Sequence, residues 1–216
     1  MSLPGLQRCK AAARVYGRAR AGMFVLLGVA ALGAAQPAAG QDLHPSRRPS
    51  PIGIARTHVG DTYVKVTYGR PYIRGRDVFG TPHDTATFLV PFGELWRTGA
   101  NEATELTTTG PITVAGQPLA AGTYSVFTVP GPQTWEVRFS PQVGLDGTGR
   151  LNEATGAFEG NVYDESRDVL RVQVPATATD DVVDQLTLSF EPGAGGADLV
   201  LRWESTEVRI PIAAAN

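Results

Sequence analysis

The chain has 216 residues, with 19 lysines and arginines against 21 acidic residues and a single cysteine. Its formal net charge is −2, so it lacks the excess of basic residues that typically binds a nucleic acid or an anionic membrane surface. One cysteine cannot form an intrachain disulfide or a thiolate zinc site, and no two of the three histidines stand at ligand spacing. We therefore expect no nucleic-acid partner, no metal and no cofactor.

Residues 1–40 have the composition of a secretory signal peptide. They contain five basic residues and no acidic one, an apolar run over residues 23–35, and then small residues up to Gly40. The apolar run is shorter than the roughly 20 residues of a membrane span, which favours cleavage over an uncleaved anchor. We predict cleavage between Gln36 and Asp42 and a periplasmic or secreted protein without a stable membrane span. Fourteen basic and 21 acidic residues remain after residue 40, a net charge of −7.

The rest of the chain predicts a proline-rich tether over residues 41–51 and one domain over 52–216. Apolar residues alternate with polar ones in short runs that Gly and Pro residues separate, as is typical of strands. The expected strands are 62–68, 105–109, 112–114, 123–129, 135–139, 169–174, 185–190, 198–203 and 208–212. This pattern predicts an all-β fold, a single antiparallel β-sandwich, with a partly closed β-barrel as the alternative. Residues 141–163 interrupt the rhythm and are expected to form a long surface loop.

The segment 93–104 concentrates the side chains best suited to binding. Trp96 offers an apolar face, Arg97 a fork of donors, and Asn101 and Glu102 polar groups that a sugar or small polar ligand requires. The alternative places Trp96 in the core, with Asn101 capping a turn. Glu94 and Glu102 are weak candidates for a catalytic carboxylate pair.

Two further arginines, Arg70 and Arg76, precede this segment. If they converge with Arg97, they would form a site for an anion or carboxylate. The alternative pairs these arginines with nearby carboxylates, those of Asp77, Glu94 and Glu102, so that they tie loops together.

Several strings in this chain resemble the exported bacterial family catalogued as domain of unknown function 2911. They are Tyr68-Gly69-Arg70-Pro71, Arg74-Gly75-Arg76-Asp77, the string from Val90 to Thr104, Ala121 to Phe127, Trp203-Glu204 and Val208 to Ile212. The resemblance covers about residues 50–212 and implies no activity, ligand or cofactor. The chain departs from the family pattern in a longer 141–163 segment and in lacking a tryptophan shortly after Trp135.

Three functions are open at this stage. The first is a non-catalytic binding or accessory module for a small polar ligand or glycan, held by Trp96, Arg97, Asn101 and Glu102. The second is a hydrolase with Glu102 as acid or base. The third is a purely structural protein in which Arg97 and Glu102 form a buried latch. The sequence favours a binding module or a latch over an enzyme.

Overall fold

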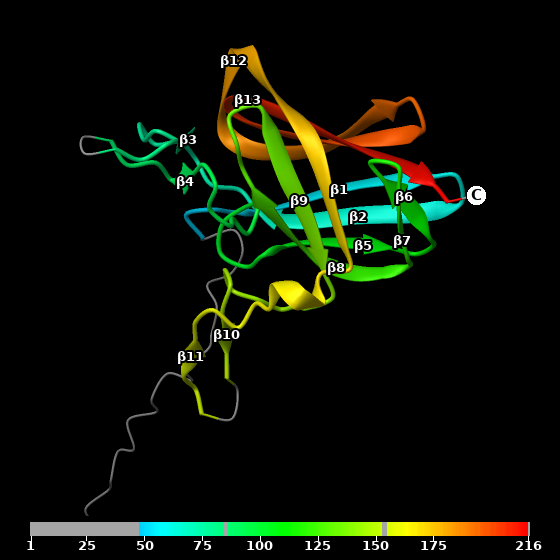
Figure 1. Ribbon diagram of the computed structural model, residues 1–216, viewed down its shortest axis with the longest axis horizontal. Helices are drawn as coiled ribbons and strands as arrows, with labels where there is room; N and C mark the ends of the chain where they lie inside the picture. Colours follow the sequence, from blue (N-terminus) through cyan, green and yellow to red (C-terminus); the bar gives the residue numbers. More distant parts are fainter. Residues whose placement is uncertain (1–47, 84–85, 153–154, 216) are drawn as a thin grey trace, which may run out of the picture. The chain divides into compact units, whose positions relative to one another are not determined.

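A computed structural model describes residues 48–83, 86–152 and 155–215 of the chain (Figure 1). The predicted signal peptide and the tether residues 41–47 lie outside the described residues. Nine strands form one antiparallel sheet in the order β1-β2-β5-β8-β9-β12-β13-β6-β7. They are β1 (Ile52–Val59), β2 (Thr62–Gly69), β5 (Thr104–Thr108), β6 (Ile112–Val114), β7 (Gln117–Leu119), β8 (Gly122–Val129), β9 (Thr134–Ser140), β12 (Leu170–Gly193) and β13 (Gly196–Ala214). The predicted all-β antiparallel fold is confirmed.

The long strand β12 connects two layers of this sheet. Its first residues, Leu170–Pro175, pair with β9, whereas the chain from Ala176 onward pairs with β13. Register shifts between Ala178 and Val183, and between Val183 and Thr187, interrupt the ladder and allow the strand to bend. In the described chain β1 and β7 end the sheet without pairing to each other, so it is not a closed barrel.

The core lies between the two layers, as the alternating pattern predicts. Val64 and Val66 of β2 are fully buried, whereas Lys65 between them is only half-buried on the other face. The same buried cluster includes Leu188 of β12 and Leu201 of β13, so residues from both layers exclude water together. This shared core supports the sandwich.

The structure differs from the predicted strands in two places. The last four predicted strands are two long ones, because β12 and β13 continue through the polar residues between them. Strand β1 was not predicted, because its large residues Ile52 and Ile54 are exposed while Gly53 and Ala55 face inward. A Cβ on Gly53 would lie 2.7 Å from the Tyr68 ring, so that ring fills the space a larger residue would need.

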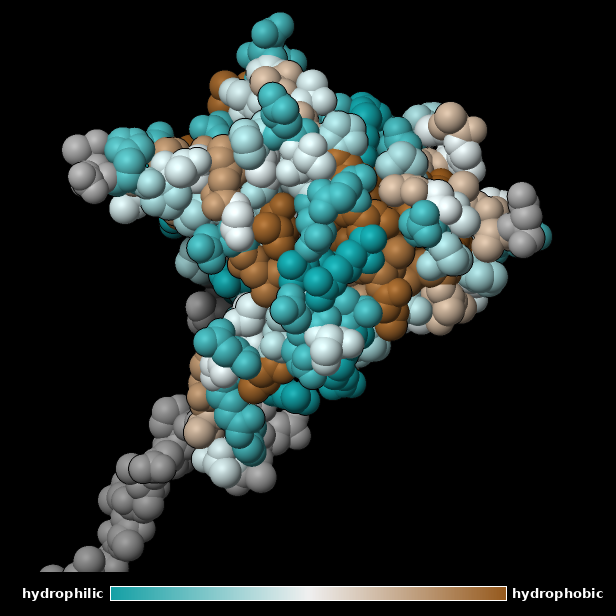
Figure 2. Space-filling view, viewed as in Figure 1, coloured by the Kyte–Doolittle hydropathy of each residue, from teal (hydrophilic) through white to brown (hydrophobic). Residues whose placement is uncertain are grey.

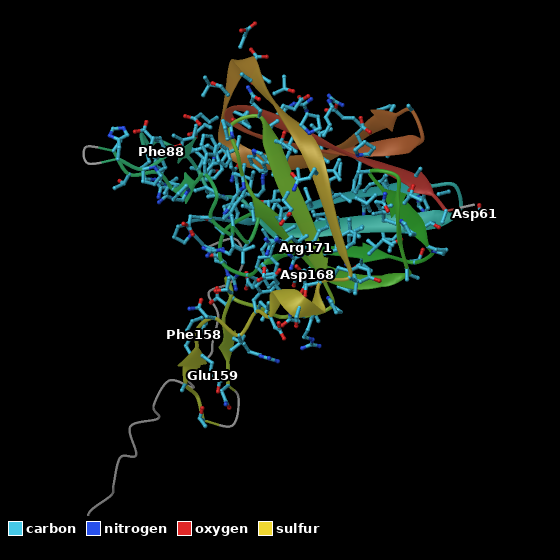
Figure 3. All side chains as sticks on the ribbon, viewed as in Figure 1. Asp61, Phe88, Phe158, Glu159, Asp168 and Arg171 are labelled. Atoms are coloured by element: carbon cyan, nitrogen blue, oxygen red, sulfur yellow. The ribbon has the colours of Figure 1, made fainter. Side chains whose placement is uncertain are left out.

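Two small pairs and one short helix lie outside the large sheet. β3 (Phe79–Gly80) and β4 (Val90–Pro91) pair in parallel, and β10 (Arg150–Leu151) pairs with β11 (Phe158–Glu159). Figure 3 labels Phe158 and Glu159 on the second pair, which lies within the predicted 141–163 loop. A 3₁₀-helix, η2 (Glu165–Arg167), then leads into β12.

The outer face of β9 and of the first part of β12 is polar. Glu136 and Arg138 of β9 lie 2.6 Å apart as an ion pair, and Gln173 of β12 donates to Glu136. Figure 2 shows this face as a hydrophilic band across the middle of the view. The opposite face of the same strands carries buried residues such as Trp135 and Val137, so polar and apolar residues alternate along the strand.

Candidate functional site

Trp96 lies in the core of the domain. Its backbone forms an isolated bridge to Thr128 of β8, with a 2.8 Å hydrogen bond in each direction. Its indole Nε1 donates to the Gly99 carbonyl at 3.0 Å, and the residue is only 9% exposed. Trp96 is therefore a buried residue and not an open aromatic platform, although it also lines a pocket described below.

All three tryptophans of the chain meet in one aromatic cluster with Phe79. Trp96 stacks on Trp203, with ring centroids 5.9 Å apart and planes 19° apart. Trp135 meets Trp96 edge-on at 6.1 Å, and the Phe79 ring lies within 6 Å of all three indoles. Such edge-on and offset contacts are the favourable geometries for aromatic rings. The cluster ties the 93–104 segment to β9 and β13.

The turn after Trp96 is held in an unusual backbone conformation. Thr98 and Asn101 have φ angles of 58° and 62°, in the left-handed region that β-branched residues such as threonine rarely enter. The Thr98 carbonyl accepts from Thr104 Oγ1 at 2.9 Å, and the Thr98 hydroxyl donates to Thr128 Oγ1 at 3.2 Å. Glu204, next to Trp203, also has a positive φ of 53°. Backbone strain of this kind gathers at binding sites more than elsewhere.

The same turn packs directly against the end of β2. The Ala100 N–H donates to the Gly69 carbonyl at 3.3 Å, and a Cβ on Gly69 would lie 1.9 Å from the Ala100 carbonyl oxygen. Only a residue without a Cβ fits at position 69 while this contact exists. Two strings of the family resemblance are therefore in direct backbone contact, Tyr68-Gly69-Arg70-Pro71 and the string from Val90 to Thr104.

Asn101 and Glu102 bind the N-terminal segment and not Arg97. The Asn101 amide donates to the Ser50 carbonyl at 3.0 Å. Arg48 Nη1 lies 2.6 Å from both carboxylate oxygens of Glu102. The alternative of a buried Arg97–Glu102 latch is therefore contradicted, because the Glu102 carboxylate is paired with Arg48. The described end of the tether lies against the domain.

The electrostatics of Glu102 follow from this partner. Partial burial raises the pKa of Glu102, but the hydrogen bond and the charge of Arg48 lower it by more than burial raises it. The pKa of Glu102 is therefore below the ordinary value of a glutamate. The carboxylate side chain remains 48% exposed. Glu102 is thus a well-ionised surface carboxylate at neutral pH.

The predicted site contains three arginines, Arg70, Arg76 and Arg97, and none of them forms an ion pair with a carboxylate in the described part of the chain. Arg70 donates to the Leu186 carbonyl and the Thr187 hydroxyl, both at 3.1 Å, which joins β2 to β12. Arg76 Nε and Nη2 donate to the carbonyls of Ile73 and Tyr72. Within the described residues, neither forms the expected ion pair with Asp77, Glu94 or Glu102, and each bonds to neutral oxygens instead.

Arg97 has a different environment from Arg70 and Arg76. Its Nε is buried and has no hydrogen-bond partner among the described residues. A buried donor without a partner lowers the free energy of unfolding by about 1–3 kcal/mol. The Arg97 guanidinium is therefore a candidate for a role in binding and not in stabilising the fold.

Glu94 does not join Glu102 at a common site. It is exposed in the turn after β4, where its N–H donates to the Pro91 carbonyl. Glu102 instead lines an apolar pocket of about 170 Å³ with Glu105, Ala103 and Ile52. The structure therefore brings Glu102 together with Glu105, a residue that the sequence analysis did not select.

A second pocket lies beside the stacked tryptophans, and we call it the tryptophan pocket. Its volume is about 220 Å³. It is lined by Ser50, Pro71, Arg76, Leu89, Val90, Trp96, Arg97, Gly99, Ala100 and Trp203. It brings together Arg76, Trp96 and Arg97 of the predicted site, but Arg70, Asn101 and Glu102 lie outside its lining. Trp203, 107 positions after Trp96, was missed as a site residue although its string was part of the family resemblance.

The end of the predicted 141–163 loop is firmly attached. The Tyr163 ring packs 4.4 Å from the Phe127 ring, and its hydroxyl lies 2.8 Å from both Asp168 oxygens. Figure 3 shows Asp168 and Arg171 side by side near η2, where Arg171 Nη2 lies 2.9 Å from Asp168. The Asp168 side chain is only 1% exposed, so this contact fixes the loop to β8 and β12.

This attachment predicts a loss of stability at alkaline pH. Partial burial and the hydrogen bond to Asp168 raise the pKa of Tyr163 to about 12. Because its pKa is about 10 in the unfolded chain, the contribution of Tyr163 is fully present below pH 10 and is lost as the pH rises through 12. We expect Tyr163→Phe to lower stability at pH 8 and to flatten its decrease between pH 10 and 12. Urea denaturation at a series of pH values measures both, and parallel pH curves for the two proteins would contradict this role.

The family model described as protein of unknown function, DUF2911, matches residues 50–212. The chain belongs to this family. The matched range is the one that the resemblance implied, and it includes the strings that contribute to the tryptophan pocket. No curated protein and no solved structure matches the chain. In the described part of this DUF2911 protein, no helix is both long and apolar enough to cross a membrane.

Proposed function

We propose that this DUF2911 domain is a non-catalytic binding module that holds a small polar ligand in the tryptophan pocket. The observation that carries the proposal is the lining of this pocket. The lining combines Leu89 and the edges of two largely buried indoles, of Trp96 and Trp203, with two arginines, Arg76 and Arg97. Apolar walls with a few placed polar groups are the usual composition of a small-molecule site.

Backbone strain around the tryptophan pocket also supports a binding function. Thr98 lies between two lining residues, and Glu204 follows a third, both with positive φ. A fold with no use for this geometry would relax it, since each strained residue costs on the order of 1–3 kcal/mol. The strained residues lie where the string from Val90 to Thr104 meets the Trp203-Glu204 string.

A small ligand fits this pocket better than a glycan. Trp96 stacks on Trp203 and is 9% exposed, so it does not offer the open ring face on which a sugar would stack. The hydrolase alternative has less support, because a general acid needs a raised pKa whereas the pKa of Glu102 is lowered.

A thermal-shift screen of the purified protein, expressed from the full-length chain, tests the proposal. Sugars, small carboxylates, phosphates and short peptides are compared, because a ligand of the native state raises the melting temperature by mass action. Leu89, 36% exposed, lines the pocket, and Leu89→Trp should remove the response by filling it. Val143→Trp, at a residue 44% exposed and outside the pocket lining, is the matched control. A response that survives Leu89→Trp would place binding elsewhere, and no response to any class would contradict a binding module.

We further propose that the domain acts outside the cytoplasm. The proposal rests on the basic head, apolar run and small residues of positions 1–40. N-terminal sequencing of the protein from cell fractions should find a chain that begins between Gln36 and Asp42 in the periplasm or medium. An intact chain that retains residues 1–35 in those fractions would contradict the predicted cleavage.

A further inference from the structure

The charge of the tryptophan pocket is positive. Its lining, drawn from the described residues, contains two arginines and no carboxylate. Other arginines of the domain are neutralised: Arg138 pairs with Glu136, and Arg202 with Glu191 and Glu207. Asp77 and Glu204 follow Arg76 and Trp203 in the chain but lie outside this lining, so the two arginines are the only charged groups among its described residues and make it locally positive.

Arg76 is positioned to meet an anion. Its Nε donates to the Ile73 carbonyl at 3.0 Å, and its Nη2 donates to the Tyr72 carbonyl at 2.8 Å. A guanidinium has five N–H donors, so these two bonds fix its plane and leave three donors, two of them on Nη1. Neutral carbonyls hold the group without cancelling its charge, which leaves it available to a carboxylate.

The remaining lining is of limited size and partly apolar. Leu89, 36% exposed, supplies most of the accessible apolar surface, and the largely buried Trp96 contributes an edge. An apolar cavity of about 150 Å³ accepts a benzene molecule, so a pocket of about 220 Å³ has room for one ring and one small charged group. Two rings, or a chain of sugars, would exceed this volume.

We propose that the ligand of this pocket is a small monocarboxylate with a single ring or a branched apolar group. Its carboxylate pairs with Arg76, and Arg97 adds to the positive potential. Its apolar part lies against Leu89 and the exposed edge of Trp96. This inference rests on the proposed binding function and gives it a ligand class.

The probe is benzoate, compared with its neutral isostere benzamide and with acetate, which has no ring. Binding to the purified protein is measured by calorimetry and by the fluorescence of the clustered tryptophans. A charge-assisted hydrogen bond corresponds to an affinity ratio of about 10 to 100, so benzoate should bind that much more tightly than benzamide. Acetate should bind more weakly than benzoate, since it has no ring to pack against Leu89 and the edge of Trp96.

Arg76→Gln should weaken benzoate by about 10- to 100-fold and leave benzamide unchanged. Unchanged benzamide affinity also shows that the pocket still forms after its loop has lost the Arg76 hydrogen bonds. Arg56→Gln is the matched control, because Arg56 is an exposed arginine on β1 outside the pocket lining. It should leave both affinities unchanged.

The failures of the two proposals are distinguishable. If benzamide binds as tightly as benzoate, or Arg76→Gln weakens neither, the carboxylate inference is wrong while the binding module stands. If sugars or phosphates stabilise the protein through this pocket and benzoate does not bind, the proposed ligand class is wrong, but the binding module still stands. If nothing binds, neither probe nor screened compound, the proposed function fails as well.

Discussion

Replacing Trp203 with alanine is expected to lower the free energy of unfolding by about 3–5 kcal/mol. Trp203 is 1% exposed and contacts the rings of Trp96 and Phe79, so its removal leaves a cavity that rigid neighbours cannot fill. Its Nε1 also donates to the Asp184 carbonyl at 3.2 Å, a hydrogen bond that would be lost. Urea denaturation followed by circular dichroism measures the change.

A pair of milder variants separates the cavity from the hydrogen bond. Trp203→Phe removes the indole N–H from the Asp184 carbonyl, which still accepts from the Ile73 N–H at 2.8 Å, whereas the buried Nε1 of Trp135 has no partner in the described structure. Trp135→Phe therefore removes an unsatisfied donor and should cost about 1–2 kcal/mol less than Trp203→Phe. Equal losses would show that the Asp184 hydrogen bond contributes nothing. A loss below about 1 kcal/mol for Trp203→Ala would contradict the central place of the cluster.

Gly69→Ala is expected to have the second largest effect, because a Cβ there would lie 1.9 Å from the Ala100 carbonyl oxygen. The backbone on both sides must separate, and such overpacking costs typically about 1–3 kcal/mol. Ala100 and Gly99 line the tryptophan pocket, so the same displacement should weaken any ligand response of the pocket. Denaturation and the thermal-shift response, measured on the same variant, check both effects.

Gly160→Ala is the control for this prediction. Nothing lies within 4 Å of a Cβ at Gly160, and this glycine is exposed. Its stability should change by less than about 0.5 kcal/mol, as for other surface substitutions. If both variants behave alike, the contact between Gly69 and Ala100 does not hold the turn in place.

Much of the fold could be predicted because strand patterns are local. The alternation of Val64 and Val66 with Lys65 assigns one face of β2 to the core regardless of what covers it. The same logic failed for β1, where the exposed Ile52 and the buried Gly53 reverse the usual pattern. That reversal depends on the Tyr68 ring, which belongs to the neighbouring strand and cannot be inferred from the residues of β1.

The candidate site was only partly predictable, since ionic partners are chosen by the fold. Glu102 is five residues from Arg97 in the chain, yet it pairs with Arg48, 54 residues away. Arg70 and Arg76 have acidic neighbours in sequence, yet backbone carbonyls are their partners. Sequence proximity gave the wrong partner in each case. Glu102 and Arg70 contact residues far away in the chain, which the fold brings beside them, whereas Arg76 bonds to backbone carbonyls of its own turn instead of to a carboxylate.

The sequence by itself determined that the chain is all-β and antiparallel, and it determined the family through strings of fixed order and spacing. Period-two alternation and turn residues act over a few positions, so they can be read without the rest of the chain. Only the tertiary structure decided that Trp96 is buried and that Trp203 stacks on it to form one wall of a pocket with Arg76. Those contacts join residues more than 100 positions apart, and they exist only because β12 bends and brings the second layer of the sheet over the first.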